Sequence, residues 1–391
     1  MNKIMRFRKS IVLLLLLIFS RSQATECLTG AAQVDKYISL LQGKRVGLTA
    51  NHTSLVGDEH LVDVLLAQDI KIACIYSPEH GFRGTADAGA HIASDKDPIT
   101  GIPIVSLYGR NKKPTAEHLR NIDIMIFDMQ DVGLRFFTYL STLHYLMEAC
   151  AEQDIPLLIL DRPNPNGFYV DGPVLEPQHR SFVGMHPIPV VHGMTLGELA
   201  QMINGEQWLN NGIQCEITVI PCKHYTRQTL YRLPIRPSPN LPNMQAVYLY
   251  ASLCFFEGTA ISLGRGTEFP FQVFGHPDYK GIYSFTFTPK SVQGASNPPL
   301  KDKLCYGVDL RNYPESKLTS NPHIRLEWLL DAYNNFKNKG QFFTTFFATL
   351  WGTTRIQKMI EQGANEQQIR DSWQADVEQF LILRKKYLLY E

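Results

Sequence analysis

The stretch that decides the fold is Ile72-Ala73-Cys74-Ile75-Tyr76-Ser77-Pro78-Glu79-His80-Gly81-Phe82-Arg83-Gly84. The apolar run at its start predicts a buried strand, and the loop that follows carries a carboxylate, an imidazole and a guanidinium among glycines. Ligands bind outside the carboxyl ends of the strands in an open parallel sheet, so this loop is a candidate site. A simpler interpretation is a tight turn in which Glu79 and Arg83 pair with each other.

Similar apolar runs lie on both sides of this stretch. They predict further strands at residues 45–49, 103–107, 122–127 and 156–160, with helices at 61–68 and 139–150. Strands that alternate with helices form βαβ units, which build a parallel sheet. We therefore expect a Rossmann-like, doubly wound α/β fold. No G-x-G-x-x-G motif follows the first strand, so no dinucleotide cofactor, and no other cofactor, is expected.

Polar residues follow each of the five predicted strands. They are Asn51, His52 and Thr53; Glu79, His80 and Arg83; Tyr108, Gly109 and Arg110; Asp128, Gln130, Asp131 and Arg135; and Asp161, Arg162 and Asn164. Because the carboxyl ends of parallel strands meet at one edge, these clusters predict a single crevice. The alternative is that Asp128 and Asp161 merely cap the helices that follow them.

The rest of the chain predicts a long loop and a capped helix in the first domain, followed by a second domain. Residues 162–187 form a proline- and glycine-rich excursion, after which Thr195 and Glu198 stand at capping-box positions of a helix. A second polar and aromatic loop lies at 264–272. A chain of 391 residues exceeds one ordinary core. We expect a catalytic domain over residues 25–280 and a smaller C-terminal α/β auxiliary domain over 281–391.

The charge balance and the N-terminus restrict partners and location. A net charge of +1 gives no general attraction to nucleic acid. The basic start, the apolar run 11–19 and Ser22-Gln23-Ala24 predict a signal peptide over residues 1–24. This run is too short to span a bilayer, so we expect cleavage after Ala24, a periplasmic protein and no permanent membrane anchor. Three of the seven cysteines lie in apolar runs, so the fold is not expected to depend on disulfides, although one bridge is left open.

Several motifs together resemble one known family. They are Ser77 to Gly84, Asp128-Met129-Gln130-Asp131-Val132-Gly133-Leu134-Arg135-Phe136-Phe137-Thr138-Tyr139, Asp161-Arg162-Pro163-Asn164-Pro165, Pro237-Ser238-Pro239-Asn240-Leu241-Pro242, and Glu257-Gly258-Thr259 with Gly264-Arg265-Gly266-Thr267. In this order they resemble the exo-β-N-acetylmuramidase family NamZ, from about Leu40 to Tyr390. The resemblance implies a Rossmann-like catalytic domain and release of N-acetylmuramic acid from the non-reducing end of peptidoglycan fragments. It also implies that Glu79 is the leading catalytic residue.

The residues themselves are compatible with this chemistry. Glycoside hydrolysis needs a protonated carboxylic acid at the leaving oxygen and either a nucleophile or a base. Glu79 suits the acid if the crevice desolvates it. The second group is left open between Asp128, Asp131, Glu257 and the acetamido group of the substrate. Arg83, Arg135 or Arg265 is expected to bind the lactyl carboxylate of muramic acid. The candidate catalytic residues are Glu79, His80, Asp128, Asp131 and Glu257, and the candidate substrate-binding residues are Asn51, Arg83, Gln130, Arg135, Tyr139, Asn164, Asn240 and Arg265.

Two rival functions fit parts of the pattern. A metallohydrolase would use His52, His80, His192 or His276 with Asp128, but no compact motif such as H-E-x-x-H is present, and we expect no metal site. A periplasmic muropeptide- or sugar-binding protein would use the same crevice without turnover. Glu79 discriminates between binding and catalysis, because binding alone does not require an acid.

Overall fold

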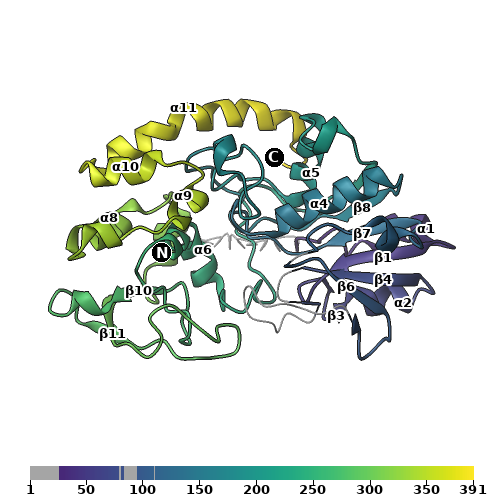
Figure 1. Cartoon of the computed structure of the whole chain (residues 1–391). Helices are drawn as coiled ribbons and strands as arrows, with labels where there is room; N and C mark the ends of the chain where they lie inside the picture. Colours follow the sequence, from purple (N-terminus) through teal and green to yellow (C-terminus); the bar gives the residue numbers. More distant parts are fainter. Residues whose placement is uncertain (1–25, 79–80, 83–94, 110) are drawn as a thin grey trace, which may run out of the picture.

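A computed structural model describes residues 26–78, 81–82, 95–109 and 111–391. Its centre is a seven-stranded sheet with the strand order β5-β6-β4-β1-β7-β8-β9 (Figure 1). The strands are β1 Arg45–Ala50, β4 Lys71–Ser77, β5 Asp95–Lys96, β6 Pro103–Ser106, β7 Ile124–Asp128, β8 Leu157–Leu160 and β9 Ile217–Ile220. Neighbouring strands are parallel throughout, except that β5 is antiparallel to β6. The predicted Rossmann-like, mostly parallel sheet is confirmed.

The five predicted strands correspond to β1, β4, β6, β7 and β8, and the sequence pattern missed β5 and β9. The β5 strand has only two residues, and β9 forms an edge of the sheet. The β9 side chains are mostly half-buried or exposed, so β9 lacks the continuous apolar character of a central strand.

Alternate side chains of the central strands enter two separate apolar cores. Ile126 of β7 and Leu158 of β8 join the core with α1 (Val34–Leu41) and α2 (Leu61–Leu66). Phe127 and Ile159, the next residue in each strand, join the larger core with α4 (Tyr139–Glu152) and α5 (Leu196–Gly205). Successive side chains of a strand point to opposite faces, so both faces of the sheet are covered. Figure 1 shows α4 and α5 on one side of the sheet and α2 on the other.

Helix α5 begins with a capping box. The Thr195 hydroxyl accepts a bond from the backbone N–H of Glu198, and the Glu198 carboxylate accepts one from the N–H of Thr195, so the predicted capping box is confirmed. Asp161 also accepts a bond from the Gly197 N–H at 2.9 Å, at the start of this same helix α5. Asp128 instead forms an ion pair, as described below.

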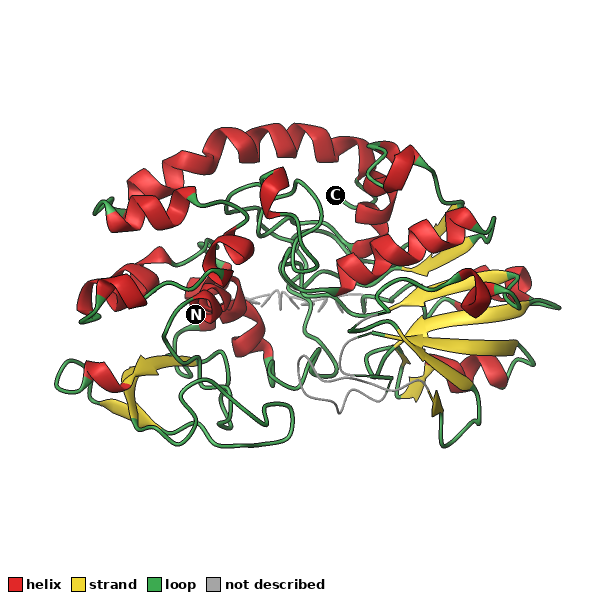
Figure 2. Cartoon of the chain, in the orientation of Figure 1, coloured by secondary structure: helices red, strands yellow, loops and turns green. Residues whose placement is uncertain are grey.

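The C-terminal region combines a small sheet with several helices (Figure 2). The sheet has the order β10-β12-β11 and is antiparallel. Its strands are β10 Val273–His276, β11 Phe285–Phe287 and β12 Cys305–Asp309, and the helices are α6 Met244–Leu253, α7 Glu315–Thr319, α8 Leu326–Asn335, α9 Phe346–Trp351, α10 Arg355–Glu361 and α11 Glu366–Arg384. Strand β10 ends before residue 280 and pairs with β12, which begins after that residue. The domain boundary near residue 280 stays a prediction.

The chain end returns to the central sheet. The Tyr390 hydroxyl donates to Asp161 Oδ2 at 2.7 Å, and the N–H of Arg227 donates to the carbonyl of Glu391 at 2.8 Å. These bonds attach the segment after α11 to residues that follow β8 and β9.

The remaining described elements are short. They are β2 Leu55–Val56, β3 Glu59–His60, α3 Ala116–Leu119 and the 3-10 helices Pro177–His179, Asn210–Gly212, Cys254–Gly258, Pro277–Tyr279, Lys339–Gln341 and Lys385–Tyr387. All seven cysteines are free thiols. In the part of the chain that the structure describes, no helix is both long and apolar enough to cross a membrane.

Candidate active site

The strand order places a topological switch point at the carboxyl end of β1. From β1 the chain proceeds to β4 and β6 on one side, then crosses to β7 and β8 on the other. Ligands bind at such a switch point because the loops of the two flanking strands diverge there. Asn51, directly after β1, and Asp128, the last residue of β7, lie at this point, and Ala50 is the register partner of Asp128.

Asn51 connects the sheet edge to the start of α4. Its side-chain N–H donates to the Tyr139 hydroxyl at 2.7 Å, and its Oδ1 accepts bonds from the N–H and the hydroxyl of Thr53 at 2.9 and 2.6 Å. The Tyr139 hydroxyl lies 3.5 Å from the carbonyl of Pro237, in the loop that carries Asn240. The structure thus brings Asn51 and Tyr139, two predicted binding residues, into direct contact.

Asp128 forms a buried bidentate ion pair with Arg162. Arg162 Nε lies 2.5 Å from Asp128 Oδ1, and Nη2 lies 2.9 Å from Oδ2. The Asp128 side chain is fully buried and that of Arg162 is 4% exposed. Burial would lower the pKa of Arg162, but the charge of Asp128 and its hydrogen bonds to the guanidinium act together to raise it. Both carboxylate oxygens of Asp128 are engaged, which leaves it poorly placed to exchange a proton with a substrate.

Asp131 has a different environment from Asp128. Its Oδ1 accepts the N–H of Gly133 at 2.6 Å, whereas its buried Oδ2 has no partner among the described residues. Burial raises the pKa of Asp131 to about 7, which is the range of a general acid or base. The neighbouring Gln130 donates from Nε2 to the carbonyls of Asp131 and Pro163, both at 2.8 Å. The adjoining cavity has a volume of only about 10 Å³, so Asp131 lacks room for a sugar beside it.

A cavity of about 80 Å³ brings together three of the predicted binding residues, namely Tyr139, Asn240 and Arg265. Arg265 pairs with Glu257, whose Oε1 lies 2.7 Å from Nε and 2.6 Å from Nη2. The guanidinium also lies 5.0 Å from the centre of the Phe271 ring. Burial would lower the pKa of Arg265, but the Glu257 charge raises it.

Asn240 also lines a wider groove of about 630 Å³. One wall of this groove is the loop from Arg236 to Pro242, and the others come from residues 266–270 and 286–293. Its volume lies in the range of small-molecule sites, roughly 300 to 1,000 Å³. The groove and the 80 Å³ cavity share Asn240, which lines both of them.

Glu79, His80 and Arg83 lie outside the described residues, but their flanking residues are placed. Ser77 ends β4, which pairs with β1, so Pro78 follows the sheet edge beside Asn51. The Phe82 ring packs edge-on against His60 with centroids 4.8 Å apart, and His60 Nε2 lies 2.8 Å from the carbonyl oxygen of Asn51. Pro78 and Phe82 therefore both lie near Asn51 at the switch point.

Two predicted binding residues have other partners in the structure. Arg135 is 1% exposed, and its guanidinium donates to the carbonyls of Pro173, Ile188, Leu350 and Trp351 at 2.7 to 3.1 Å. Burial lowers the pKa of Arg135 to about 9. Asn164 is also buried, donates to the carbonyl of Met194 and accepts from the N–H of Asn166, both at 2.8 Å. These contacts favour a structural role for both residues over the predicted binding role.

The expected list of site residues omitted Arg162, although it neutralises Asp128. The sequence did indicate Arg162 by its position shortly after β8, because β8 lies beside β7, the strand that ends in Asp128. Within the described ranges, one group of side chains is spaced closely enough to hold a metal ion, and it lies away from the switch point. It consists of His323, Glu327 and Glu366. This group contains none of the residues considered for a metallohydrolase.

An α/β sheet with carboxylates, amides and a guanidinium at its switch point has the architecture in which ligand-binding and catalytic sites occur. Similarity to known proteins identifies the class of enzyme. The models of the N-terminal and C-terminal domains of exo-β-N-acetylmuramidase NamZ match residues 46–245 and 248–390. The chain therefore belongs to the NamZ family and is a glycosidase, as the resemblance of its motifs implied.

Individual relatives agree with this assignment. The chain is 40% identical over 375 residues to peptidoglycan β-N-acetylmuramidase NamZ of Bacillus subtilis (strain 168), covering 90% of this chain and 89% of that protein. A crystal structure of a DUF1343 family protein from Bacteroides fragilis is 52% identical with a TM-score of 0.88, covering 94% of this chain and 99% of that one. A second DUF1343 protein of that organism is 30% identical with a TM-score of 0.78, covering 93% and 99%.

Proposed function

We propose that this protein is an exo-acting glycosidase that releases N-acetylmuramic acid from the non-reducing end of peptidoglycan fragments. The observation that carries the proposal is the 40% identity, over nine-tenths of the chain, to a peptidoglycan β-N-acetylmuramidase. The groove of about 630 Å³ beside Asn240 supports it, because it offers room for a saccharide.

Glu79 is the proposed catalytic acid. Support comes from its position after β4, between Pro78 and Phe82, which both lie near Asn51 at the switch point. A general acid must hold its proton until the glycosidic bond breaks, which requires a carboxyl group with a raised pKa. In the reaction Glu79 would give its proton to the glycosidic oxygen as the bond to the anomeric carbon breaks, and water would supply the new hydroxyl.

Glu257 is better placed than Asp128 or Asp131 to be the second protein carboxylate. Its side chain is 23% exposed beside the cavity, and Oε2 has only the Cys254 thiol as a described partner, at 3.6 Å. Asp128 has both oxygens bound to Arg162, and Asp131 adjoins a cavity too small for a sugar. The acetamido group of the substrate is the alternative nucleophile.

Arg265 is the proposed partner of the lactyl carboxylate. Its Nε and Nη2 contact Glu257, while Nη1 has no partner in the described part of the chain. The side chain is 20% exposed at the cavity. A guanidinium held in place by one carboxylate can bind a second one with a charge-assisted hydrogen bond.

The test is hydrolysis of a disaccharide with N-acetylmuramic acid at its non-reducing end, with Glu79→Gln as the variant and the exposed Glu117→Gln as the matched control. General acid catalysis contributes roughly 10²- to 10⁴-fold, so Glu79→Gln should lose activity by that factor without a change in melting temperature. A natural leaving group is needed, since an activated aryl group requires little protonation. Binding of the disaccharide without any turnover by the wild type would indicate a binding protein instead.

We also propose that the protein is exported to the periplasm. The basic N-terminus, the apolar run 11–19 and the small residues Ser22 and Ala24 support this. N-terminal sequencing of the protein from the periplasmic fraction should find Thr25 as the first residue. An intact Met1, or a lipid on Cys27, would contradict the proposal.

A further inference from the structure

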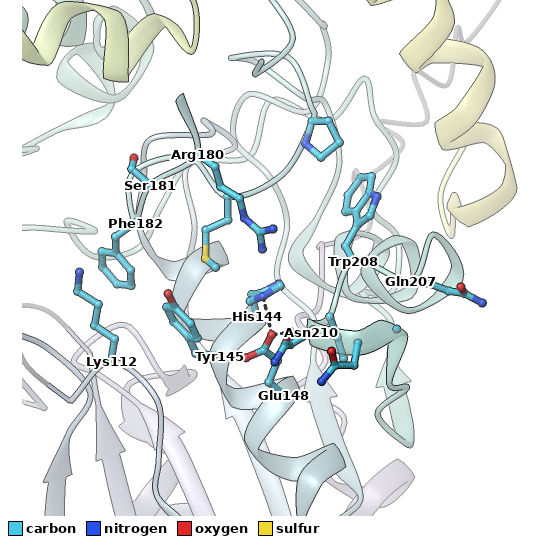
Figure 3. A pocket seen from close by; sticks show the side chains of 15 residues that line it. Lys112, His144, Tyr145, Glu148, Arg180, Ser181, Phe182, Gln207, Trp208 and Asn210 are labelled. Carbon is cyan, nitrogen blue, oxygen red and sulfur yellow. Dashed lines mark hydrogen bonds and ion pairs between the residues drawn. The ribbon is translucent and has the colours of Figure 1, made fainter. Parts of the chain in front are cut away.

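A second large pocket lies along α4, separate from the groove beside Asn240 (Figure 3). It has a volume of about 710 Å³ and is formed by α4, residues 180–187 and residues 207–212 after α5. We call it the α4 pocket and define it by Tyr145, Glu148, Arg180, Phe182, Trp208 and Asn210. None of the predicted site residues lines it. Its volume is typical of sites for small molecules.

Aromatic rings form two of its walls. Tyr145 and Phe182 are nearly parallel, with centroids 6.3 Å apart and an interplanar angle of 14°. Trp208 is half-buried and stacks on His186 at 5.4 Å. Figure 3 shows Trp208 on the side of the pocket opposite Tyr145 and Phe182. A ring held by such stacking presents a rigid apolar face to the pocket, and the C–H face of a sugar packs well on a surface of this kind.

The unpaired charges of the pocket are positive. Arg180 is exposed and Figure 3 shows its guanidinium pointing into the space between Tyr145 and Trp208. Lys112 lies 4.5 Å from the centre of the Phe182 ring. Neither cation has an acidic partner among the residues that the structure places. A pocket with two such cations favours an anionic ligand.

The acid in the lining already has partners. Glu148 Oε2 lies 3.1 Å from Lys113 Nζ, which also pairs with Glu152 at 2.7 Å, and Glu148 Oε1 accepts the N–H of Asn210 at 2.8 Å. The floor contributes little charge: His144 Nδ1 lies 3.0 Å from His186 Nε2, and burial lowers the pKa of His144 to about 4. At neutral pH the attraction for an anion therefore comes from Arg180 and Lys112.

We propose that the α4 pocket is a second, non-catalytic binding site for an acidic sugar, with the sugar ring on Trp208 and its carboxylate on Arg180. The identification of the sugar as N-acetylmuramic acid rests on the proposed function. Tyr145 follows Tyr139, which lines the 80 Å³ cavity, by six residues, which is about 9 Å along the helix axis and about a third of a turn around it. The bound sugar is either a further unit of the glycan strand or the free released product.

Tryptophan fluorescence tests the proposal directly with N-acetylmuramic acid as the probe. The chain has four tryptophans, and Trp328, Trp351 and Trp373 are buried, so Trp208 is the one that a ligand can contact. We expect a saturable fluorescence change that Trp208→Phe abolishes and the matched control Trp328→Phe retains. Arg180→Gln, at an exposed position, should weaken binding about tenfold or more, since a charge-assisted hydrogen bond is worth roughly 1.5 to 3 kcal/mol.

Two results would overturn the proposal. One is a fluorescence change that persists in Trp208→Phe, and the other is an equal response to N-acetylglucosamine, which lacks the carboxylate. Failure of the proposed function is a separate result, because it would appear as absence of hydrolysis by the wild type whatever Trp208 reports.

Kinetics distinguish the two sources of the sugar. If the pocket holds a strand unit, Arg180→Gln should raise the KM for long glycan strands and leave hydrolysis of a single-sugar aryl muramide unchanged. If it holds the free product, Arg180→Gln should leave both KM values unchanged while the fluorescence response to N-acetylmuramic acid weakens.

Discussion

Asp128→Asn should destabilise the protein more than it impairs the chemistry. The substitution leaves the Arg162 guanidinium, 4% exposed, without its counter-charge. The remaining described partner of Arg162 is the carbonyl of Leu55, at 3.0 Å from Nη2. Breaking a buried ion pair from one side costs roughly 3 to 5 kcal/mol. Because Asn can still accept one hydrogen bond, we expect about 3 kcal/mol, which is more than a 100-fold change in the folding constant.

The chain provides a matched control on the same strand segment. Arg45 forms a bidentate pair with Asp123, just before β7, at 3.0 and 2.6 Å, but these side chains are 41% and 36% exposed. Water screens that pair, so Asp123→Asn should have a much smaller effect than Asp128→Asn. Adding Arg162→Met to Asp128→Asn should recover part of the loss, since it removes the uncompensated buried charge.

The assay is urea unfolding of each variant at pH 7, with the m value unchanged, alongside hydrolysis of the muramyl disaccharide. The reasoning would be refuted if Asp128→Asn kept the unfolding free energy within about 1 kcal/mol of wild type while turnover fell roughly 10²-fold or more. Asp128 would then be a catalytic group.

Three further predictions concern other charged groups. Arg135→Met removes the donor to four buried carbonyls and should cost at least about 3 kcal/mol of unfolding free energy; an unchanged stability with a raised KM would instead support the binding role. Arg265→Gln should lower the ratio of muramide to glucosaminide turnover about tenfold or more, because only the muramide carries the lactyl carboxylate; an unchanged ratio would exclude this contact. Burial raises the pKa of Asp131 to about 7, above roughly 3.9 for an unfolded aspartate, so its contribution to stability is fully present below about pH 4 and is lost as the pH rises through 7. The difference in unfolding free energy between wild type and Asp131→Asn should fall over that interval, and a flat difference would contradict the assignment.

Local patterns in the sequence were sufficient to find the sheet and the edge that carries the site. Strands β4, β7 and β8 are buried on both faces, so their side chains had to be apolar in succession. Polar residues directly after such runs had to lie at the carboxyl edge, and Asn51 and Asp128 do so. The same logic failed for β9, an edge strand whose exposed positions interrupt the apolar run.

What the sequence by itself determined about this protein was the fold class, the sheet edge at which Asn51 and Asp128 lie and, through its motifs, the family. Only the tertiary structure decided which polar residues are free to act. Arg135 and Arg265 both lie in glycine-containing motifs, yet Arg135 is held by carbonyls from residues 173 to 351, whereas Arg265 faces a cavity beside Glu257. Asp128 and Asp131 are three residues apart, yet one is paired with Arg162 and the other is not. These differences depend on partners distant in the chain, and no local pattern encodes the desolvation and pairing that such partners impose.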